Sequence, residues 1–464
     1  MNTQRPLSLW WDLLGEDTPS RLRLVRNTDV DVVIVGGGLT GLWTAYHLKY
    51  RNPAVSVCVV EADVCGFGAS GRNGGWVSAL FSISDSGLDR RYGRDAMHRM
   101  RRAMNEAIDH VGATAHDEGI ACGFHKGGTL VAARSAAQVQ RARTEVDESR
   151  KLGFSDDEIS WLEAREANER MAMDSLLGAT FTPHCAVVQP ASLVRGLAVA
   201  AERLGVVIYE HSPAISMEEG RQGQRPRVIT RGGTITADVV VRATEAWTSQ
   251  LPGSKRSLIP VYSLMVATEP LDDATWDSIG LHDRETFSEY RNMIIYGQRT
   301  ADKRFAFGGR GAPYHFGSRI RSRFDQEPAV FQRLHETLRE LFPQIGDAAI
   351  THTWGGPLGI ARDWHSSVGL NRDTGIAWAG GYVGDGVSTT NLAGRTLASL
   401  ILNDGDEIAT LPWVGHRSPA WEPEPLRWLG VNAGLMATRY ADSREAITGK
   451  PSKVAATMGH LLGG

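Results

Sequence analysis

The sequence has few cysteines, no long hydrophobic run and little net charge. Its four cysteines, Cys58, Cys65, Cys122 and Cys185, are scattered in a spacing that suits neither a disulfide framework nor a set of metal ligands. No run of about eighteen apolar residues occurs, so we expect no membrane-spanning helix. The formal net charge of −3 provides no strong field for nucleic acid or an anionic membrane. We therefore expect no metal site, no membrane span and no nucleic-acid partner.

The N-terminus lacks the continuous apolar segment of a signal peptide and carries acidic residues early. With so few cysteines, this favours a reducing, cytoplasmic location. The chain has 464 residues, which is more than one compact core usually holds. Its hydrophobic content of 42% and charged content of 22% are ordinary for a soluble protein. These numbers predict two closely packed globular domains.

Residues 29–61 change character in a way that is typical of a strand–helix–strand unit. The apolar run at 32–35 reads as a strand buried on both faces, and a glycine turn with the letters GGGLTG follows at 36–41. Helical spacing comes next, and then a second strand at 55–60 that ends on Glu61. This order matches the dinucleotide-binding fingerprint in its expected context.

Each residue of that fingerprint has a physical role. Gly36 allows the tight turn, Gly38 lets a pyrophosphate approach the helix N-terminus, and Gly41 lets helix and strand pack closely. Glu61 stands where an acidic side chain accepts from ribose hydroxyls, which disfavours NADP. NAD and FAD both remain open at this point.

A second glycine-rich segment, GFGASGRNGGW at 66–76, begins five residues after Glu61. Dense glycine usually serves close approach of the backbone to another group. A loop that returns to the same crevice with backbone N–H groups suits an extended cofactor such as FAD, with Arg72 and Asn73 as further donors. The alternative is a linker in which Arg72 is merely solvated.

Three segments carry a family resemblance: DVVIVGGGLTGLWTAYHL at 31–48, EADVCGFGASGRNGG at 61–75 and AGGYVGDGVSTTNLAGR at 379–395. Together they resemble the D-amino-acid oxidase/glycine oxidase superfamily of FAD-dependent oxidoreductases. The chain is most similar to the amine oxidoreductases that are like γ-glutamylputrescine oxidase. The resemblance implies an α/β fold. In this fold a Rossmann-like, glutathione-reductase-like FAD-binding domain is interleaved with a smaller α+β substrate domain on an antiparallel sheet.

The expected domain limits follow from the resemblance and from the pattern of strands and helices. They are an N-terminal extension at 1–28, an FAD-binding domain at 29–100, 185–252 and 350–410, a substrate domain at 101–184 and 253–349, and a C-terminal tail at 411–464. Prolines from 412 onward favour an extended segment that wraps the surface, packed on its own domain, although a role in binding a partner stays open.

The resemblance and the fingerprint together imply a set of cofactor-binding positions. These are Gly36, Gly38, Leu39, Thr40, Gly41, Glu61, Ala62, Gly68, Ala69, Ser70, Arg72, Asn73, Gly74, Gly75, Trp76, Ala214, Ala243, Thr244, Trp247, Gly356, Gly381, Tyr382, Gly384, Asp385, Gly386 and Val387. We expect FAD to be bound non-covalently, because no cysteine lies beyond 185 and the segment 66–76 contains no histidine.

Two departures from the family pattern are informative. Glu245 replaces a glycine in the segment RATEAW, which puts a direct backbone contact there in doubt. Leu358 occupies the position at which relatives that act on α-amino acids carry an arginine for the substrate carboxylate, and leucine cannot form a bidentate clamp. Arg362 can substitute from nearby, or instead pair with Asp363 or stay solvated.

These departures favour an amine over a simple amino acid as the substrate. The expected reaction is hydride transfer from a primary or secondary amine to flavin N5, followed by hydrolysis of the imine, with oxygen or an electron carrier as the acceptor. An α-amino-acid oxidase or dehydrogenase, or a non-catalytic flavin-binding interaction protein, is the alternative, and a homo-oligomer is possible. The candidate pocket residues, with His352, Trp354 and Tyr262 as the catalytic candidates, are His352, Trp354, Tyr262, Tyr296 and Tyr382.

Overall fold

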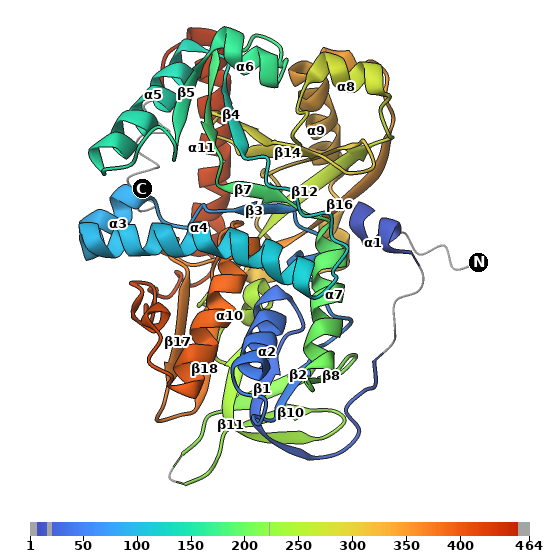
Figure 1. Ribbon diagram of the computed structural model, residues 1–464, viewed down its shortest axis with the longest axis vertical. Helices are drawn as coiled ribbons and strands as arrows, with labels where there is room; N and C mark the ends of the chain where they lie inside the picture. The colour runs from blue at the N-terminus through green and yellow to red at the C-terminus, as the bar shows by residue number, and fades with distance from the viewer. Residues whose placement is uncertain (1–6, 16–20, 222, 453–464) are drawn as a thin grey trace.

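The computed structural model describes residues 7–15, 21–221 and 223–452. Two eight-stranded sheets form the body of the protein, and a two-stranded ribbon lies between them. In Figure 1 the first sheet occupies the lower half of the molecule, and the long helix α4 crosses between it and the second sheet above.

The first sheet has a core of parallel strands in the order β18, β11, β1, β2, β8. Antiparallel strands extend it through β17 beside β18, and through β10 and β9 beside β11. The bounds are β1 Thr28–Val35, β2 Val57–Val60, β8 Val207–Tyr209, β9 Ala214–Glu218, β10 Arg227–Thr230, β11 Thr234–Arg242, β17 Ser367–Asn371 and β18 Ile376–Gly380. Three helices pack with this sheet: α2 Leu39–Arg51, α7 Pro190–Arg203 and α10 Gly386–Leu402.

Strand β1 shows why the apolar run at 32–35 is continuous. Val32 and Ile34 belong to the hydrophobic core on one face of the sheet, where α2, α7 and α10 also pack. Val33 and Val35 belong to a separate core on the other face. A strand covered on both faces has no side for polar residues, so the alternation of an exposed strand is absent.

The second sheet has the order β16, β12, β15, β14, β13, β4, β6, β5, and every neighbouring pair except β13–β4 is antiparallel. Its strands are β4 Thr129–Ala133, β5 Ser160–Glu163, β6 Gly178–Thr182, β12 Ile259–Thr268, β13 Thr286–Glu289, β14 Ile295–Arg299, β15 Phe305–Gly309 and β16 Ile350–Ile360. Its helices are α5 Ala136–Lys151, α6 Ala164–Arg170, α8 Asp273–Ile279 and α9 Pro328–Leu341. The predicted fold class, a Rossmann-like domain interleaved with an α+β domain on an antiparallel sheet, is confirmed.

Two segments lie on a different side of the predicted domain limits. Strand β16 pairs along its length with β12 in the second sheet, for example Leu264 with Gly355, although the sequence assigns 350–410 to the first domain. Helix α4 (Arg94–Asp117) buries Met97, Met100 and Met104 in the core of the first sheet, although the sequence assigns 101–184 to the second domain. Both boundaries depend on long-range packing, which local periodicity does not report.

The connections between the two sheets also form regular structure. The ribbon pairs β3 (Trp76–Ser78) with β7 (Cys185–Val187), and α3 (Asp85–Tyr92) leads into α4. Figure 1 shows the ribbon at the level of α4, between the sheets. The chain thus crosses from one sheet to the other several times, and each sheet contains segments that are far apart in the sequence.

The C-terminal tail contains a helix that the sequence analysis did not expect. Helix α11 (Leu426–Thr448) begins directly after the last proline of the tail's proline-rich stretch, so the extended segment ends there. The Asp442 carboxylate accepts from the backbone N–H of Met293 at 2.8 Å. Trp421, ahead of the helix, is buried and donates from Nε1 to the carbonyl of Ile360 at 2.8 Å. The tail therefore packs on its own chain.

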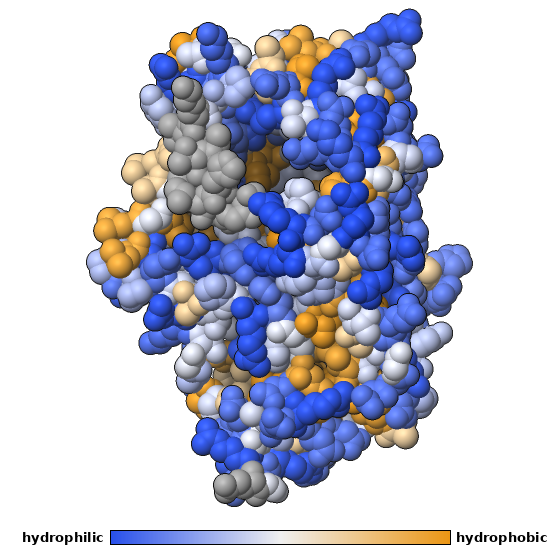
Figure 2. Space-filling view, turned by 90° about the vertical axis from the view of Figure 1, so that its left-hand side faces the viewer, coloured by the Kyte–Doolittle hydropathy of each residue, from blue (hydrophilic) through white to orange (hydrophobic). Residues whose placement is uncertain are grey.

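Hydrophilic residues cover most of the face that Figure 2 shows, and hydrophobic residues gather in patches on its lower half. Among the helices of the described residues, none is long and apolar enough to cross a bilayer. The described residues also contain no group of three or more histidine, cysteine, aspartate or glutamate side chains placed to hold a metal ion.

Candidate cofactor and substrate site

A cavity of about 520 Å³ opens at the carboxyl ends of the parallel strands in the first sheet. Val35 and Val60, the last residues of β1 and β2, form part of its wall, and Ala243, directly after β11, forms another part. Ligands of open α/β sheets bind at this edge, outside the carboxyl ends of the strands.

The glycine turn after β1 is closed to larger residues. Gly36 has φ +113°, and a Cβ placed on it would lie 2.5 Å from the carbonyl oxygen of Ala243. A Cβ on Gly41 would lie 2.0 Å from the carbonyl oxygen of Gly36. The turn therefore brings bare backbone to the cavity while α2 packs tightly on β1.

Two helices begin at the cavity wall without a capping side chain. Helix α2 has Gly38 as its N-cap, and α10 has Asp385, whose side chain makes no capping hydrogen bond. Gly38, Leu39, Gly386 and Val387 all line the cavity. A helix N-terminus carries a partial positive charge and unsatisfied N–H groups, so both ends favour an anionic or electron-rich ligand.

Glu61 is fixed where the fingerprint predicts it, at the end of β2. Its Oε2 accepts from the Gly37 N–H at 2.7 Å, and its Oε1 accepts from the Asp63 N–H at 2.9 Å. Burial raises the pKa of this carboxyl, while the backbone hydrogen bonds oppose the shift. The carboxylate is therefore oriented by backbone contacts in the cavity wall.

The glycine-rich loop at 66–76 forms the facing wall. Ser70 Oγ accepts from the Leu39 N–H at 2.9 Å, so the loop contacts the first turn of α2. Asn73 lines the cavity, and its Oδ1 accepts from the Gly75 N–H at 2.8 Å. The N-terminal helix α1 (Leu9–Leu14) braces the loop from behind, because Trp10 Nε1 donates to the carbonyl of Asn73 at 2.8 Å.

Arg72 is not among the residues that line the cavity. Its side chain is buried, forms an ion pair with Asp325 at 2.9 Å and donates to the carbonyl of Gly355 at 3.0 Å. These contacts join the glycine-rich loop to the second sheet. The structure thus gives Arg72 a partner within the protein, whereas the sequence suggested a donor to the cofactor.

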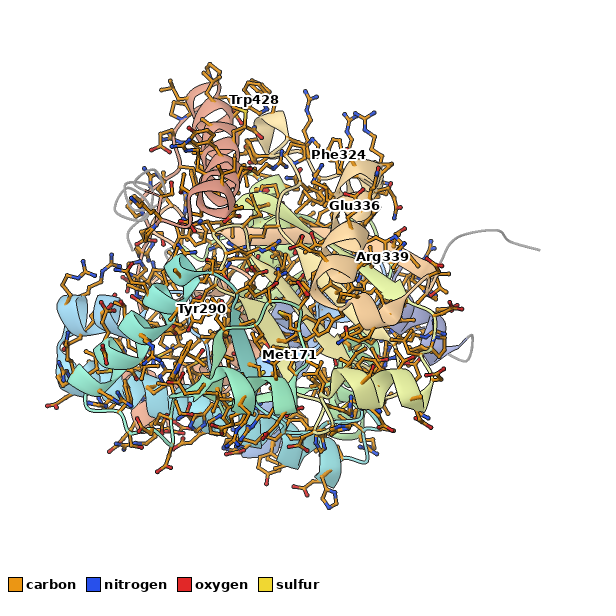
Figure 3. All side chains as sticks on the ribbon, turned by 90° about the horizontal axis from the view of Figure 1, so that it is seen from above. Met171, Tyr290, Phe324, Glu336, Arg339 and Trp428 are labelled. Carbon is orange, nitrogen blue, oxygen red and sulfur yellow. The ribbon has the colours of Figure 1, made fainter. Side chains whose placement is uncertain are left out.

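None of the three catalytic candidates lines the cavity. His352 Nε2 lies 3.1 Å from Oδ2 of Asp12, and Trp354 is buried with its Nε1 donating to the Arg72 carbonyl at 2.9 Å. Tyr262 is wholly buried and packs edge-on against Phe324, which Figure 3 places beside α9; burial raises the pKa of Tyr262 to about 12.

The two other tyrosine candidates differ from each other. The Tyr296 hydroxyl lies 2.8 Å from Oγ of Ser263, and Tyr296 is not among the residues that line the cavity. Tyr382 lines the cavity, and its hydroxyl lies 3.0 Å from Oγ1 of Thr40. Burial raises the pKa of Tyr382 far above its usual value, so its hydroxyl stays protonated.

Most of the predicted cofactor positions converge on this one cavity. Those that line it are Gly36, Gly38, Leu39, Thr40, Glu61, Ala62, Gly68, Ala69, Ser70, Asn73, Ala214, Ala243, Thr244, Trp247, Tyr382, Gly384, Gly386 and Val387. Those that do not are Gly41, Arg72, Gly74, Gly75, Trp76, Gly356, Gly381 and Asp385.

Other lining residues were not named as cofactor positions. They are Val35, Val60, Asp63, Phe67, Pro213, Glu245, Ala246, Leu251, Pro357, Leu358 and Thr390. Several are apolar neighbours of predicted residues, and a rule that includes the residue on each side of a motif would have found them. Glu245 and Leu358 are the two departures from the family pattern, and both lie in the cavity wall.

Glu245 takes an unusual conformation in the cavity wall. Its φ is +44°, and its Oε1 accepts from the N–H groups of Gly381 and Tyr382, both at 3.1 Å. Its Oε2 faces Gly359 closely and has no hydrogen bond of good geometry among the described residues. Burial raises the pKa of the Glu245 carboxyl to about 7. The side chain therefore joins the loop before α10 to the end of β11 and holds a proton near neutral pH.

Comparison with known proteins gives one consistent result. The family described as FAD dependent oxidoreductase (DAO) matches residues 31–400. Gamma-glutamylputrescine oxidoreductase of Escherichia coli is 29% identical over 388 residues, which cover 82% of this chain and 86% of that protein. The probable oxidoreductase OrdL of Haemophilus influenzae is 28% identical, covering 83% and 86%.

Solved structures share the fold. The glycine oxidase of Geobacillus kaustophilus superposes with a TM-score of 0.70 at 22% identity, covering 84% of this chain and 99% of that one. The L-proline dehydrogenase of P. horikoshii gives a TM-score of 0.68 at 19% identity, covering 83% and 96%.

Proposed function

Since the chain belongs to the DAO family of FAD-dependent oxidoreductases, we propose that it oxidises a primary or secondary amine to an imine, which water then hydrolyses. The observation that carries the choice of an amine is Leu358, an apolar residue in the cavity wall. The resemblance places an arginine there when the substrate is an α-amino acid, and leucine cannot bind a carboxylate. The relative from E. coli, named for γ-glutamylputrescine, supports the same choice.

The residues of the cavity fit FAD. The bare backbone at Gly36 and Gly38 and the uncapped start of α2 suit a pyrophosphate, and the fixed carboxylate of Glu61 suits ribose hydroxyls. The second uncapped start, at α10, suits the electron-rich end of a flavin. When bound, FAD supplies the hydride acceptor.

The chain's own groups would bind, orient and shield the substrate. Leu251, Pro357 and Leu358 give the wall apolar surface that excludes water. The Tyr382 hydroxyl, paired with Thr40, is a protonated group that can orient a substrate nitrogen. Glu245 can hold or release a proton at Oε2, because its carboxyl titrates near neutral pH. Amine oxidation needs a neutral amine in place more than it needs a strong base.

The test begins with the absorbance spectrum of the purified protein, in which bound flavin is yellow. Acid precipitation should release the flavin into the supernatant if it is held non-covalently. Anaerobic mixing with a panel of amines, α-amino acids and hydroxy acids should then bleach the flavin with an amine. If only α-amino acids or only hydroxy acids bleach it, the amine proposal is wrong. Peroxide formation under air separates an oxidase from a dehydrogenase.

A further inference from the structure

Arg310 lies beside the cavity wall, directly after β15 of the second sheet. Its Nη2 donates to the carbonyl of Val383 at 2.5 Å, and the same atom lies 3.4 Å from where a Cβ on Gly384 would be. Cδ1 of Leu358 lies 3.6 Å from that point. The guanidinium and the leucine side chain therefore converge on Gly384, and Gly384 and Leu358 both line the cavity.

The Arg310 guanidinium has few hydrogen-bond acceptors and no bonded carboxylate among the described residues. A guanidinium offers five N–H donors, and Val383 supplies the one hydrogen-bond acceptor that the described residues give it. No carboxylate of the described residues lies within 4.0 Å of it, and its other close partner is the ring of Trp364 at 5.4 Å. Desolvation lowers the pKa of Arg310, because it disfavours the charged form of the guanidinium.

The buried arginines Arg72 and Arg21 differ from Arg310, because each has a carboxylate partner. Arg72 forms an ion pair with Asp325 at 2.9 Å, and Arg21 pairs with Glu202 at 2.7 Å. Arg310 is only partly buried and has no bonded anion among the described residues, so its guanidinium is open to an anion that a ligand supplies. Asp385 acts on Arg310 through its charge but does not contact it, and burial raises the pKa of Asp385 to about 6.

We propose that Arg310 is a specificity-determining residue that binds a carboxylate of the substrate, on a carbon remote from the amine nitrogen. The proposal rests on the amine oxidation proposed above and narrows its substrate class to amines that carry a remote carboxylate. Leu358 occupies the place of the expected α-carboxylate clamp, and Arg310 comes from a different strand of the second sheet. The anion that Arg310 holds therefore belongs to another part of the substrate.

The first experiment measures anion binding without turnover. Oxidised holoenzyme is titrated with n-pentanoate, and the flavin difference spectrum reports its dissociation constant. We expect Arg310→Met to weaken binding at least tenfold, which is about 1.4 kcal/mol, and Arg310→Lys to weaken it less. Arg165→Met is the matched control, because its side chain is 93% exposed on α6. Equal binding by wild type and Arg310→Met would overturn the proposal.

The second experiment asks which substrates depend on Arg310. Straight-chain ω-amino acids of increasing length are compared with the n-alkylamines and the α-amino acids of the same length, by anaerobic flavin reduction. We expect Arg310→Met to raise KM for the ω-amino acid at least tenfold more than KM for the matched alkylamine, with a smaller effect on kcat. Equal effects on both series, or the largest effect on the α-amino acids, would overturn the assignment.

Failure of this inference can be told apart from failure of the proposed function. If pentanoate binding depends on Arg310 but no amine bleaches the flavin, the anion site stands and amine oxidation is wrong. A second outcome is that amines bleach the flavin while Arg310→Met changes neither pentanoate binding nor the ratio of KM for the ω-amino acid to KM for the alkylamine. In that case amine oxidation stands and the inference is wrong. The FAD content and melting temperature of each variant show whether it is folded. If Arg310→Met is misfolded, Arg310→Lys is compared with wild type in its place.

Discussion

The indole Nε1 of Trp10 donates a hydrogen bond of 2.8 Å to the backbone carbonyl of Asn73, in the middle of the glycine-rich loop. Ser8 Oγ donates to the carbonyl of Gly71 at 3.1 Å in the same way. The N-terminal extension therefore does more than precede the first strand, since α1 supports a loop that forms one wall of the cofactor cavity.

Substitution of Trp10 should weaken FAD binding without unfolding the protein. Trp10→Phe keeps most of the ring but removes the hydrogen bond, which costs about 1 kcal/mol. We expect the dissociation constant of FAD to rise several-fold, measured by quenching of flavin fluorescence on reconstitution of the apoprotein. Trp428→Phe on α11 is the control, because Trp428 is 38% exposed and Figure 3 places it on that outlying helix. An unchanged FAD affinity in Trp10→Phe would show that α1 does not support the loop.

Substitution of Gly36 tests the cofactor turn. In Gly36→Ala the new Cβ would meet the Ala243 carbonyl at 2.5 Å, and φ +113° is unfavourable for any side chain. We expect loss of bound FAD and a lower melting temperature. Gly430→Ala is the matched control, since a Cβ there meets nothing within 4 Å and alanine favours the helix by about 1 kcal/mol. A yellow, stable Gly36→Ala protein would contradict the assignment.

Glu245 should make stability depend on pH near neutrality. Its carboxyl has a pKa of about 7 in the folded chain, above the ordinary value of 4.5, so the folded state binds this proton more tightly than the unfolded state. Wild-type stability should therefore fall as pH rises from about 4.5 through 7. Glu245→Gln removes the titration, so we expect its melting temperature to exceed that of wild type at pH 8 by more than at pH 5.

The control for that experiment is Glu166→Gln, an exposed position on α6. Its melting temperature should follow wild type at every pH. A constant difference between Glu245→Gln and wild type from pH 5 to pH 8 would show that the Glu245 carboxyl does not titrate in this range.

The Arg72–Asp325 ion pair should hold the glycine-rich loop against the second domain. Asp325→Asn leaves the buried guanidinium without its counter-charge, which costs about 3 kcal/mol of unfolding free energy. Arg72→Met combined with Asp325→Asn should cost less than the sum of the two single changes, measured by denaturant titration. The exposed pair Arg143–Glu163, at 2.8 Å, is the control and should show coupling near zero. Additive effects at Arg72 and Asp325 would argue against the ion pair.

The sequence predicted those parts of the site that depend on local order. The glycine turn, Glu61 and the start of α10 each follow a strand within a few residues, and short-range chemistry is enough to recognise them. Strand β1 is recognised in the same way, because a sheet covered on both faces demands apolar runs. The family resemblance then joined these separate pieces into one expected cavity.

The parts that the sequence missed depend on long-range packing. Strand β16 pairs with β12, which lies about ninety residues earlier in the chain, and no local pattern marks that partner. Tyr262, His352 and Trp354 are aromatic or polar residues near a motif, but the structure turns them toward Phe324, Asp12 and Arg72. Arg310 belongs to no motif, and only the meeting of β15 with the loop before α10 brings it beside the residues of the cavity wall.

The pairing of β1 with β11 has a consequence for how the chain folds while the ribosome synthesises it. Thr28 faces Ile235 across that pair, and β18, which adds to β11, is not made until residue 380. The strand–turn–helix fingerprint is synthesised early, but β1 has no strand neighbour on one side until β11 is complete at residue 242, about half of the chain. The apolar edge of β1 therefore stays unpaired during this part of synthesis, and an unpaired edge is prone to aggregation. The cofactor cavity is completed later still, because its lining includes Val387 and Thr390 as well as Val35.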